Sequence, residues 1–192
     1  MSPPRAFLDA CVLFPPLVRG LLLHAAAQNL HDPAWSPRVI EEWARATARD
    51  HGEPAGDAVR AEAASMARRW PDAFTEPNPD HLAQSLPDED DVHVLAAALT
   101  AKADLLVTFN LRDFPAPKLR RLGLAPISPD AFLWELAGRS PVPMARAIAA
   151  ALAPFPGLQG PQDIARALKR AHVPRLAKMI RTGALTLETP CA

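Results

Sequence analysis

The segment from residue 92 to residue 134 alternates between helical and strand patterns, and this alternation limits the folds open to the chain. Apolar residues at helical spacing run to about residue 102, and the β-branched apolar run DLLVTFN then predicts a buried strand that ends at Asn110. KLRRLG predicts a short helix that stops at Gly123, LAPIS predicts another strand, and Pro129 begins another helix. Strands that alternate with helices favour a parallel sheet covered on both faces, which is an α/β fold.

The N-terminal part of the chain continues this alternation. AFLDACVLF predicts a strand through Leu8 with Asp9 at its carboxyl end, and a helix rich in Leu and Ala follows to about Gln28. A short strand is expected at the pair AW. Ser36 and Pro37 come next, and they have the form of an N-cap and a first helical residue.

Beyond the α/β pattern the chain predicts helices alone. The expected domains are residues 1–137, the α/β part, and residues 138–192, an all-helical extension with helices at about 142–152, 161–172 and 174–182. The net charge is zero, but residues 136–192 carry eight Lys and Arg against two acids, whereas residues 1–135 carry 13 against 19. A basic end on an acidic body indicates that the two parts either meet different surfaces or attract each other.

Acids fall where a parallel sheet gathers ligands, at the carboxyl ends of its strands. Four separate segments bring an acid or an amide there: Asp9, Glu41 or Glu42, Asp88 to Asp91, and Asn110 with Asp113. Carboxylates so arranged raise one another's pKa unless a cation is present. Oxygen ligands without His or Cys select magnesium or manganese over zinc, and such a cation serves phosphodiester hydrolysis. A run of acids also begins a helix without any metal, and Asp88 and Asp90 are expected to be helix caps or groups near the metal rather than direct ligands.

Several stretches together resemble PIN-domain ribonucleases of the VapC toxin kind, over about residues 5–136: FLDACVLFP, WSPRVIEEW, PDEDDVHVLAAALTAKADLLVTFNLRDFP and PISPDAFL. The resemblance implies a PIN-like three-layer α/β/α sandwich around a mostly parallel sheet. It implies an endoribonuclease that uses Mg²⁺ or Mn²⁺ to hydrolyse RNA and that acts as the toxin of a toxin–antitoxin pair. The partners implied are an RNA substrate and a cognate antitoxin, and a homodimer stays open.

The resemblance also carries over to single residues. Asp9 matches the family's first acid, Glu42 the second and Asp91 the third, and these three are the expected metal ligands. Glu42 is preferred because it lies six residues after Ser36, although Glu41 stays open since both glutamates flank the apolar stripe of their helix.

The chain departs from the family pattern at the fourth acidic position. Asn110 stands there, and Asp113 is the nearest carboxylate, so both are expected beside the catalytic acids. An amide cannot carry the charge of an Asp. Cys11 is a second departure, because many members have a polar Asn, Ser or Thr at that position. Both departures bear on metal affinity rather than on the fold.

The basic extension suggests where RNA would bind. Arg166, Lys169 and Arg170 share one face of a predicted helix, which is the pattern expected for phosphate contacts. The alternative interpretation is an extension that covers the acidic body or contacts the antitoxin. Two other functions stay open for the whole chain: a non-catalytic nucleic-acid-binding protein that uses these helices, and a housekeeping RNA-processing nuclease.

The sequence predicts a cytoplasmic protein with no membrane partner. No segment approaches the roughly 18 apolar residues of a membrane helix, and the N-terminus reaches an acid too early for a signal peptide. Cys11 and Cys191 lie far apart in sequence and lack zinc-ligand spacing, which favours free thiols in a reducing compartment.

Overall fold

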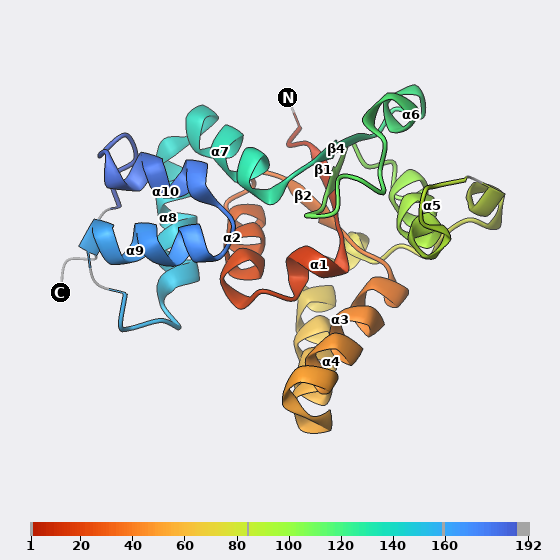
Figure 1. The fold of residues 1–192 in the computed structure, drawn as a ribbon, viewed down its shortest axis with the longest axis horizontal. Coiled ribbons are helices and arrows are strands. Elements are labelled where there is room, and N and C mark those ends of the chain that lie inside the picture. Colours follow the sequence, from red (N-terminus) through yellow and green to blue (C-terminus); the bar gives the residue numbers. More distant parts are fainter. Residues whose placement is uncertain (1, 84, 159, 188–192) are drawn as a thin grey trace. The chain divides into compact units, whose positions relative to one another are not determined.

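The sheet determines where the candidate site lies. A computed structural model describes residues 2–83, 85–158 and 160–187, and Cys191 lies outside this range. In this part of the chain a four-stranded sheet has the order β2-β1-β3-β4, and every neighbouring pair is parallel (Figure 1). Its strands are β1 (Arg5–Leu8), β2 (Asp32–Ala34), β3 (Leu105–Val107) and β4 (Ala125–Ile127). The predicted α/β class with a parallel sheet and a helical extension is confirmed. The chain passes from β1 to β2 on one side of it and then returns to form β3 on its other side. The strand order therefore reverses between β1 and β3, and open α/β sheets bind ligands at such a point.

The described chain packs into two compact units. The first consists of the residues up to Phe14 together with Asp32–Ile127, and it contains the sheet. The second consists of Pro15–His31 together with the residues from Ser128 onward, and it is helical. The predicted domains, residues 1–137 and 138–192, are continuous segments of the sequence, whereas each compact unit combines two segments. The predicted boundary after residue 137 stays a prediction.

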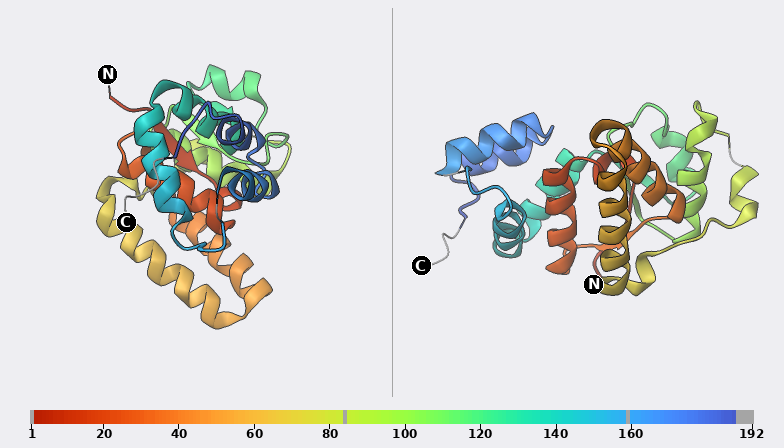
Figure 2. Two further views of the ribbon diagram at one scale, coloured as in Figure 1. Left: turned by 90° about the vertical axis from the view of Figure 1, so that its left-hand side faces the viewer. Right: turned by 90° about the horizontal axis from the view of Figure 1, so that it is seen from below.

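The helices of the first unit begin where the sequence supplies caps. Ser36 Oγ accepts a hydrogen bond from the backbone N–H of Val39 at 3.2 Å, and Pro37 is the first helical residue, as predicted. This unit contains the α-helices α1 (Ala10–Leu13), α3 (Pro37–His51), α4 (Glu53–Arg69), α5 (Val92–Thr100) and α6 (Ala116–Arg121), and the 3₁₀ turns η1 (Pro71–Ala73), η2 (Pro79–Ala83) and η3 (Glu89–Asp91). The helices α3 and α4 form an antiparallel pair (Figure 2).

Two expected elements differ from the structure, each for a local reason. The helix expected up to Gln28 is divided, because Pro15 interrupts it and Pro16 begins α2 (Pro16–Ala27) in the second unit. The strand expected to end at Asn110 ends at Val107, because the hydroxyl of Thr108 accepts the backbone N–H of Asn110 and turns the chain.

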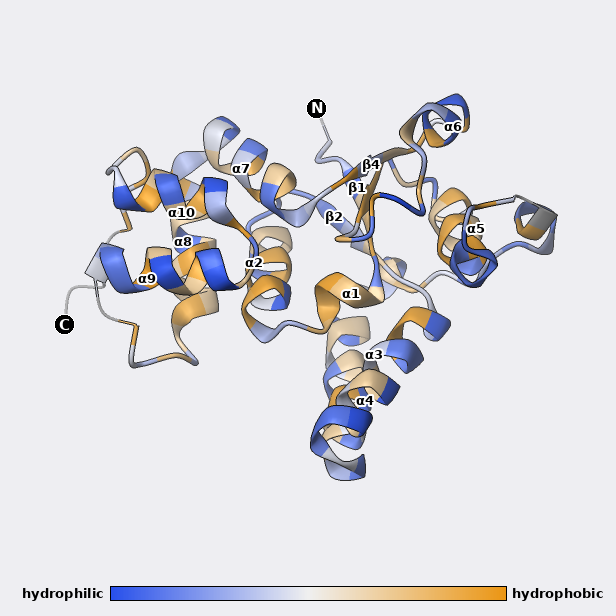
Figure 3. Cartoon of the chain, viewed as in Figure 1, coloured by the Kyte–Doolittle hydropathy of each residue, from blue (hydrophilic) through white to orange (hydrophobic). Residues whose placement is uncertain are grey.

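The second unit contains α2 together with α7 (Pro129–Arg139), α8 (Pro141–Leu152), α9 (Gly160–Arg170) and α10 (Pro174–Arg181). In α9 the side chains of Ile164 and Leu168 are buried, and in α10 those of Leu176 and Ile180 are buried. The opposite faces of both helices are hydrophilic (Figure 3). Within the described residues, each helix is too short or too polar to cross a bilayer.

Candidate metal centre

Two side chains emerge at the carboxyl ends of the central strands. Asp9 directly follows β1 and Thr108 directly follows β3. The Thr108 hydroxyl donates a hydrogen bond to Asp9 Oδ2 at 2.7 Å, and the Cys11 thiol donates to the same oxygen at 3.0 Å. Asp9 is only 7% exposed, so these two donors fix a buried carboxylate.

Cys11 acts here as a neutral donor. Burial raises the pKa of its thiol to about 12, and the charge of Asp9 adds to this effect. A thiol with this pKa stays protonated at neutral pH, so it is a donor rather than a thiolate ligand. The sulfur also accepts the backbone N–H of Phe109 at 3.2 Å, which joins the turn after β3 to the start of α1.

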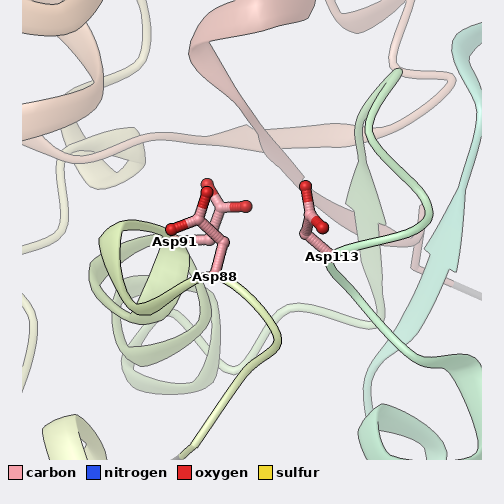
Figure 4. Close-up of side chains that lie close together, drawn as sticks. All are labelled: Asp88, Asp91 and Asp113. Atoms are coloured by element: carbon pink, nitrogen blue, oxygen red, sulfur yellow. The ribbon is translucent and has the colours of Figure 1, made fainter.

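Three carboxylates form a close group in the same unit (Figure 4). Asp88, Asp91 and Asp113 each offer an oxygen, and these oxygens lie within 4.8 Å of one another. Asp88 caps η3 because its Oδ1 accepts the backbone N–H of Asp90 at 2.9 Å. Residues three apart eclipse each other in a 3₁₀ turn, so Asp88 and Asp91 lie on one side of it and face Asp113.

The electrostatics of the group centre on Asp91. Its pKa is raised from 3.8 to about 6, first by burial and then by the charges of Asp9, Asp88 and Asp113. Its Oδ2 is buried and has no hydrogen-bond partner among the described residues. A buried oxygen without a donor, surrounded by further carboxylates, is the environment that a cation would stabilise. Since every candidate ligand atom in this group is a carboxylate oxygen, the residues fit a hard divalent ion such as Mg²⁺ or Mn²⁺.

The structure separates the two adjacent glutamates of α3. Glu41 accepts hydrogen bonds from Arg45 at 3.0 Å and from Arg60 of α4 at 3.0 Å. Glu42 instead contacts His93 of α5, with 2.8 Å between its Oε1 and Nε2 of His93. Glu42 therefore lies toward the helix that follows Asp91, which favours it over Glu41 as a site residue.

The contacts of Glu42 also set its charge. Burial raises the pKa of Glu42, but the hydrogen bond and charge of His93 and those of Arg38 outweigh this effect, so its pKa is lowered overall. Arg38 Nε lies 3.2 Å from the same Oε1 that His93 contacts. Glu42 is therefore ionised at neutral pH.

Asn110 and Asp113 act together at the fourth acidic position. Asn110 is exposed, and its side-chain amide donates a hydrogen bond to Asp113 Oδ2. Asp113 in turn belongs to the close group with Asp88 and Asp91. The charge that an amide cannot supply is thus present three residues later, on a carboxylate that Asn110 contacts.

The structure groups the predicted residues in part. It places Asp91 and Asp113 in the close group and Asp9 near enough for its charge to act on Asp91. Glu42 lies outside that group. Asp88 belongs to it, although the sequence favoured a role as a helix cap or as a group outside the direct metal ligands. The spacing of three residues between two acids at a helix start was the signal that could have indicated Asp88.

Thr108 and His93 are the supporting residues that sequence reasoning did not identify. Thr108 is the one polar residue in the run LLVTF, and it is fully buried. A lone hydroxyl at the carboxyl end of a buried strand was therefore a usable signal. His93 lies in the stretch PDEDDVHV, but its partner Glu42 comes from α3, and no local sequence pattern shows that contact.

The basic residues expected to bind RNA lie on α9 of the second unit. Arg166, Lys169 and Arg170 are all exposed. Arg166 forms an ion pair with Asp163 at 2.7 Å, so its charge is partly compensated. Lys169 and Arg170 have no ion-pair partner in the part of the chain that the structure describes. Of the three side chains, these two are the most available to an anionic ligand.

Comparison with known protein families identifies the family of this chain. The family described as a PIN domain matches residues 5–112, which is more than half of the 192 residues. This range contains β1, β2, β3, Asp9, Glu42 and the start of α5. No curated protein and no solved structure matches the chain.

Proposed function

The chain belongs to the PIN-domain family, and from this membership and its acidic site we propose that it is a Mg²⁺- or Mn²⁺-dependent endoribonuclease. The family supports nuclease chemistry, and the acidic group supports metal binding. The observation that carries the proposal is the close group itself: one oxygen from each of Asp88, Asp91 and Asp113 lies within 4.8 Å of the others. Asp91 also has a buried Oδ2 without a hydrogen-bond donor within the described residues.

Each carboxylate has its own part in the proposed site. Asp91, Asp88 and Asp113 would hold the cation, and Asp9 would join them with its orientation fixed by Thr108. A divalent cation bound there supplies an activated water and stabilises the negative charge that develops on the phosphate. Without a cation these carboxylates repel the RNA backbone, because both carry negative charge.

Cleavage of RNA by the full chain tests the proposal. We expect cleavage with Mg²⁺ or Mn²⁺, loss of cleavage with EDTA, and loss of at least about 100-fold in rate for Asp91→Asn, because it removes a charged ligand. Fragment sizes and end groups identify the phosphodiester bond that is broken. Full cleavage with zinc and none with magnesium would show that the hard-cation argument is wrong.

The finer role that we propose is that of a toxin with a cognate antitoxin. The support is the sequence resemblance together with the uncompensated carboxylates, since a partner's Arg or Lys fits such a cluster. Expression of the chain alone should arrest growth, and Asp9→Asn should relieve the arrest. A wild-type chain that is harmless at high level would favour housekeeping RNA processing instead.

A further inference from the structure

His93 is a buried polar residue to which the proposed metal centre assigns no role. It is the second residue of α5, it follows Asp91 by two positions, and it is 6% exposed. Its Nε2 lies 2.8 Å from Glu42 Oε1, so it connects α5 to α3. Its Nδ1 is buried without a hydrogen-bond partner among the described residues, so this contact with Glu42 is its one polar attachment there.

The two contacts of Glu42 fall on the same oxygen. His93 from α5 and Arg38 from α3 both approach Oε1, at 2.8 Å and 3.2 Å. Neither of these two contacts involves Oε2, and the Glu42 side chain is 36% exposed. The Arg38 side chain is 57% exposed, whereas that of His93 is 6% exposed, so the histidine is the more rigid of the two supports.

We propose that His93 is the positioning residue for Glu42: it holds the glutamate of α3 against the helix that follows Asp91 and leaves Oε2 free for the cation. The inference rests on the proposed function, because it takes the group of Asp88, Asp91 and Asp113 as the metal centre. Glu42 lies outside that group. A flexible glutamate there would visit many rotamers, and a buried donor on one oxygen restricts it to few.

Binding of Mn²⁺ to the full chain, followed by the electron paramagnetic resonance signal of free Mn²⁺ without RNA, tests this role. His93→Leu removes the donor and keeps an apolar side chain of similar size. We expect it to raise the Kd for Mn²⁺ by roughly 10- to 100-fold, the usual effect of losing a residue that orients a ligand. His93→Gln should restore the affinity to within about threefold, because its amide reaches the position of Nε2 and donates to Glu42.

A double-mutant comparison separates positioning from a purely structural role. Glu42→Gln should weaken Mn²⁺ binding by a similar factor, and His93→Leu added to it should cause little further loss, since both act through one carboxylate. His31→Leu is the matched control. His31 is also buried, at 2% exposure, and contacts the Leu22 carbonyl in the second unit. That variant should unfold more easily without changing Mn²⁺ affinity.

The outcomes distinguish this inference from the proposed function. If His93→Leu or Glu42→Gln binds Mn²⁺ as the wild type does, the positioning role is wrong. If His93→Leu does not fold, His93→Asn replaces it, because its shorter amide cannot reach Glu42; equal Mn²⁺ affinities of the Asn and Gln variants would then overturn the role. A wild type that binds Mn²⁺ in a His93-dependent way but does not cleave RNA would refute only the proposed function.

Discussion

Replacing Asp91 by Asn should stabilise the metal-free protein and abolish its response to magnesium. In the folded chain the pKa of Asp91 is raised from 3.8 to about 6, with burial as the largest cause and the neighbouring carboxylates next. The ionised side chain therefore destabilises the fold at neutral pH, although it is the form that a cation needs. Asn keeps the shape of the side chain and removes the charge.

The size of the effect follows from the shift in pKa. A rise from 3.8 to about 6 corresponds to an upper limit of roughly 3 kcal/mol at neutral pH. Solvent screens a half-buried carboxylate, so about 1 kcal/mol is a realistic gain for Asp91→Asn. Because the folded pKa lies above the unfolded one, the folded chain binds more protons between pH 4 and pH 6. The free energy of unfolding of the wild type should therefore fall as the pH rises through that window, whereas the variant has no such group and should not show this fall.

Thermal unfolding of the full chain in EDTA at pH 4 and pH 7.5 measures this difference. We expect the variant to unfold about 2–4 °C higher at pH 7.5 and to match the wild type near pH 4. Magnesium should raise the unfolding temperature of the wild type and leave that of Asp91→Asn unchanged. Asp90→Asn, an exposed neighbour outside the close group, is the control. A variant less stable than the wild type in EDTA at pH 7.5 would refute the reasoning, because Asp91 would then contribute favourable contacts.

Three further predictions concern the turn, the helix pair and the basic helix. Asn110→Asp should tighten Mg²⁺ binding and Asp113→Asn should weaken it, both by about tenfold in calorimetric titration; an unchanged affinity for Asn110→Asp would make Asn110 a structural residue. Gly56→Ala should cost about 1–3 kcal/mol in urea unfolding, because the added Cβ would lie 2.9 Å from Ala48 Cβ of α3; a more stable variant would contradict this close approach. Gln at all three basic positions of α9 should reduce the log–log salt slope of RNA binding by up to about 0.7 per lost contact without changing Mg²⁺ affinity. The three positions are Arg166, Lys169 and Arg170. An unchanged slope would indicate that they contact a partner other than RNA.

Local sequence patterns were sufficient for most elements and for the position of Asp9, which directly follows β1. Asp9 could be predicted because an acid that interrupts an apolar run at the end of a strand has no capping role there. The cap at Ser36 was readable for a similar reason, since the Ser–Pro pair satisfies a specific need of a helix start. The break at Pro15 was also local, and a stricter reading of that proline would have found it.

The remaining site features depend on partners from distant segments. Glu41 and Glu42 flank the apolar stripe of α3 almost equally, so periodicity could not separate them. What separates them is Arg60 of α4 on one side and His93 of α5 on the other. The same holds for the acids at the start of α5, which act as caps in a local reading. Only the turn after β3, which brings Asp113 to them, makes them a candidate metal centre. The surroundings of each carboxylate therefore depend on contacts between separate elements, which local sequence patterns do not show.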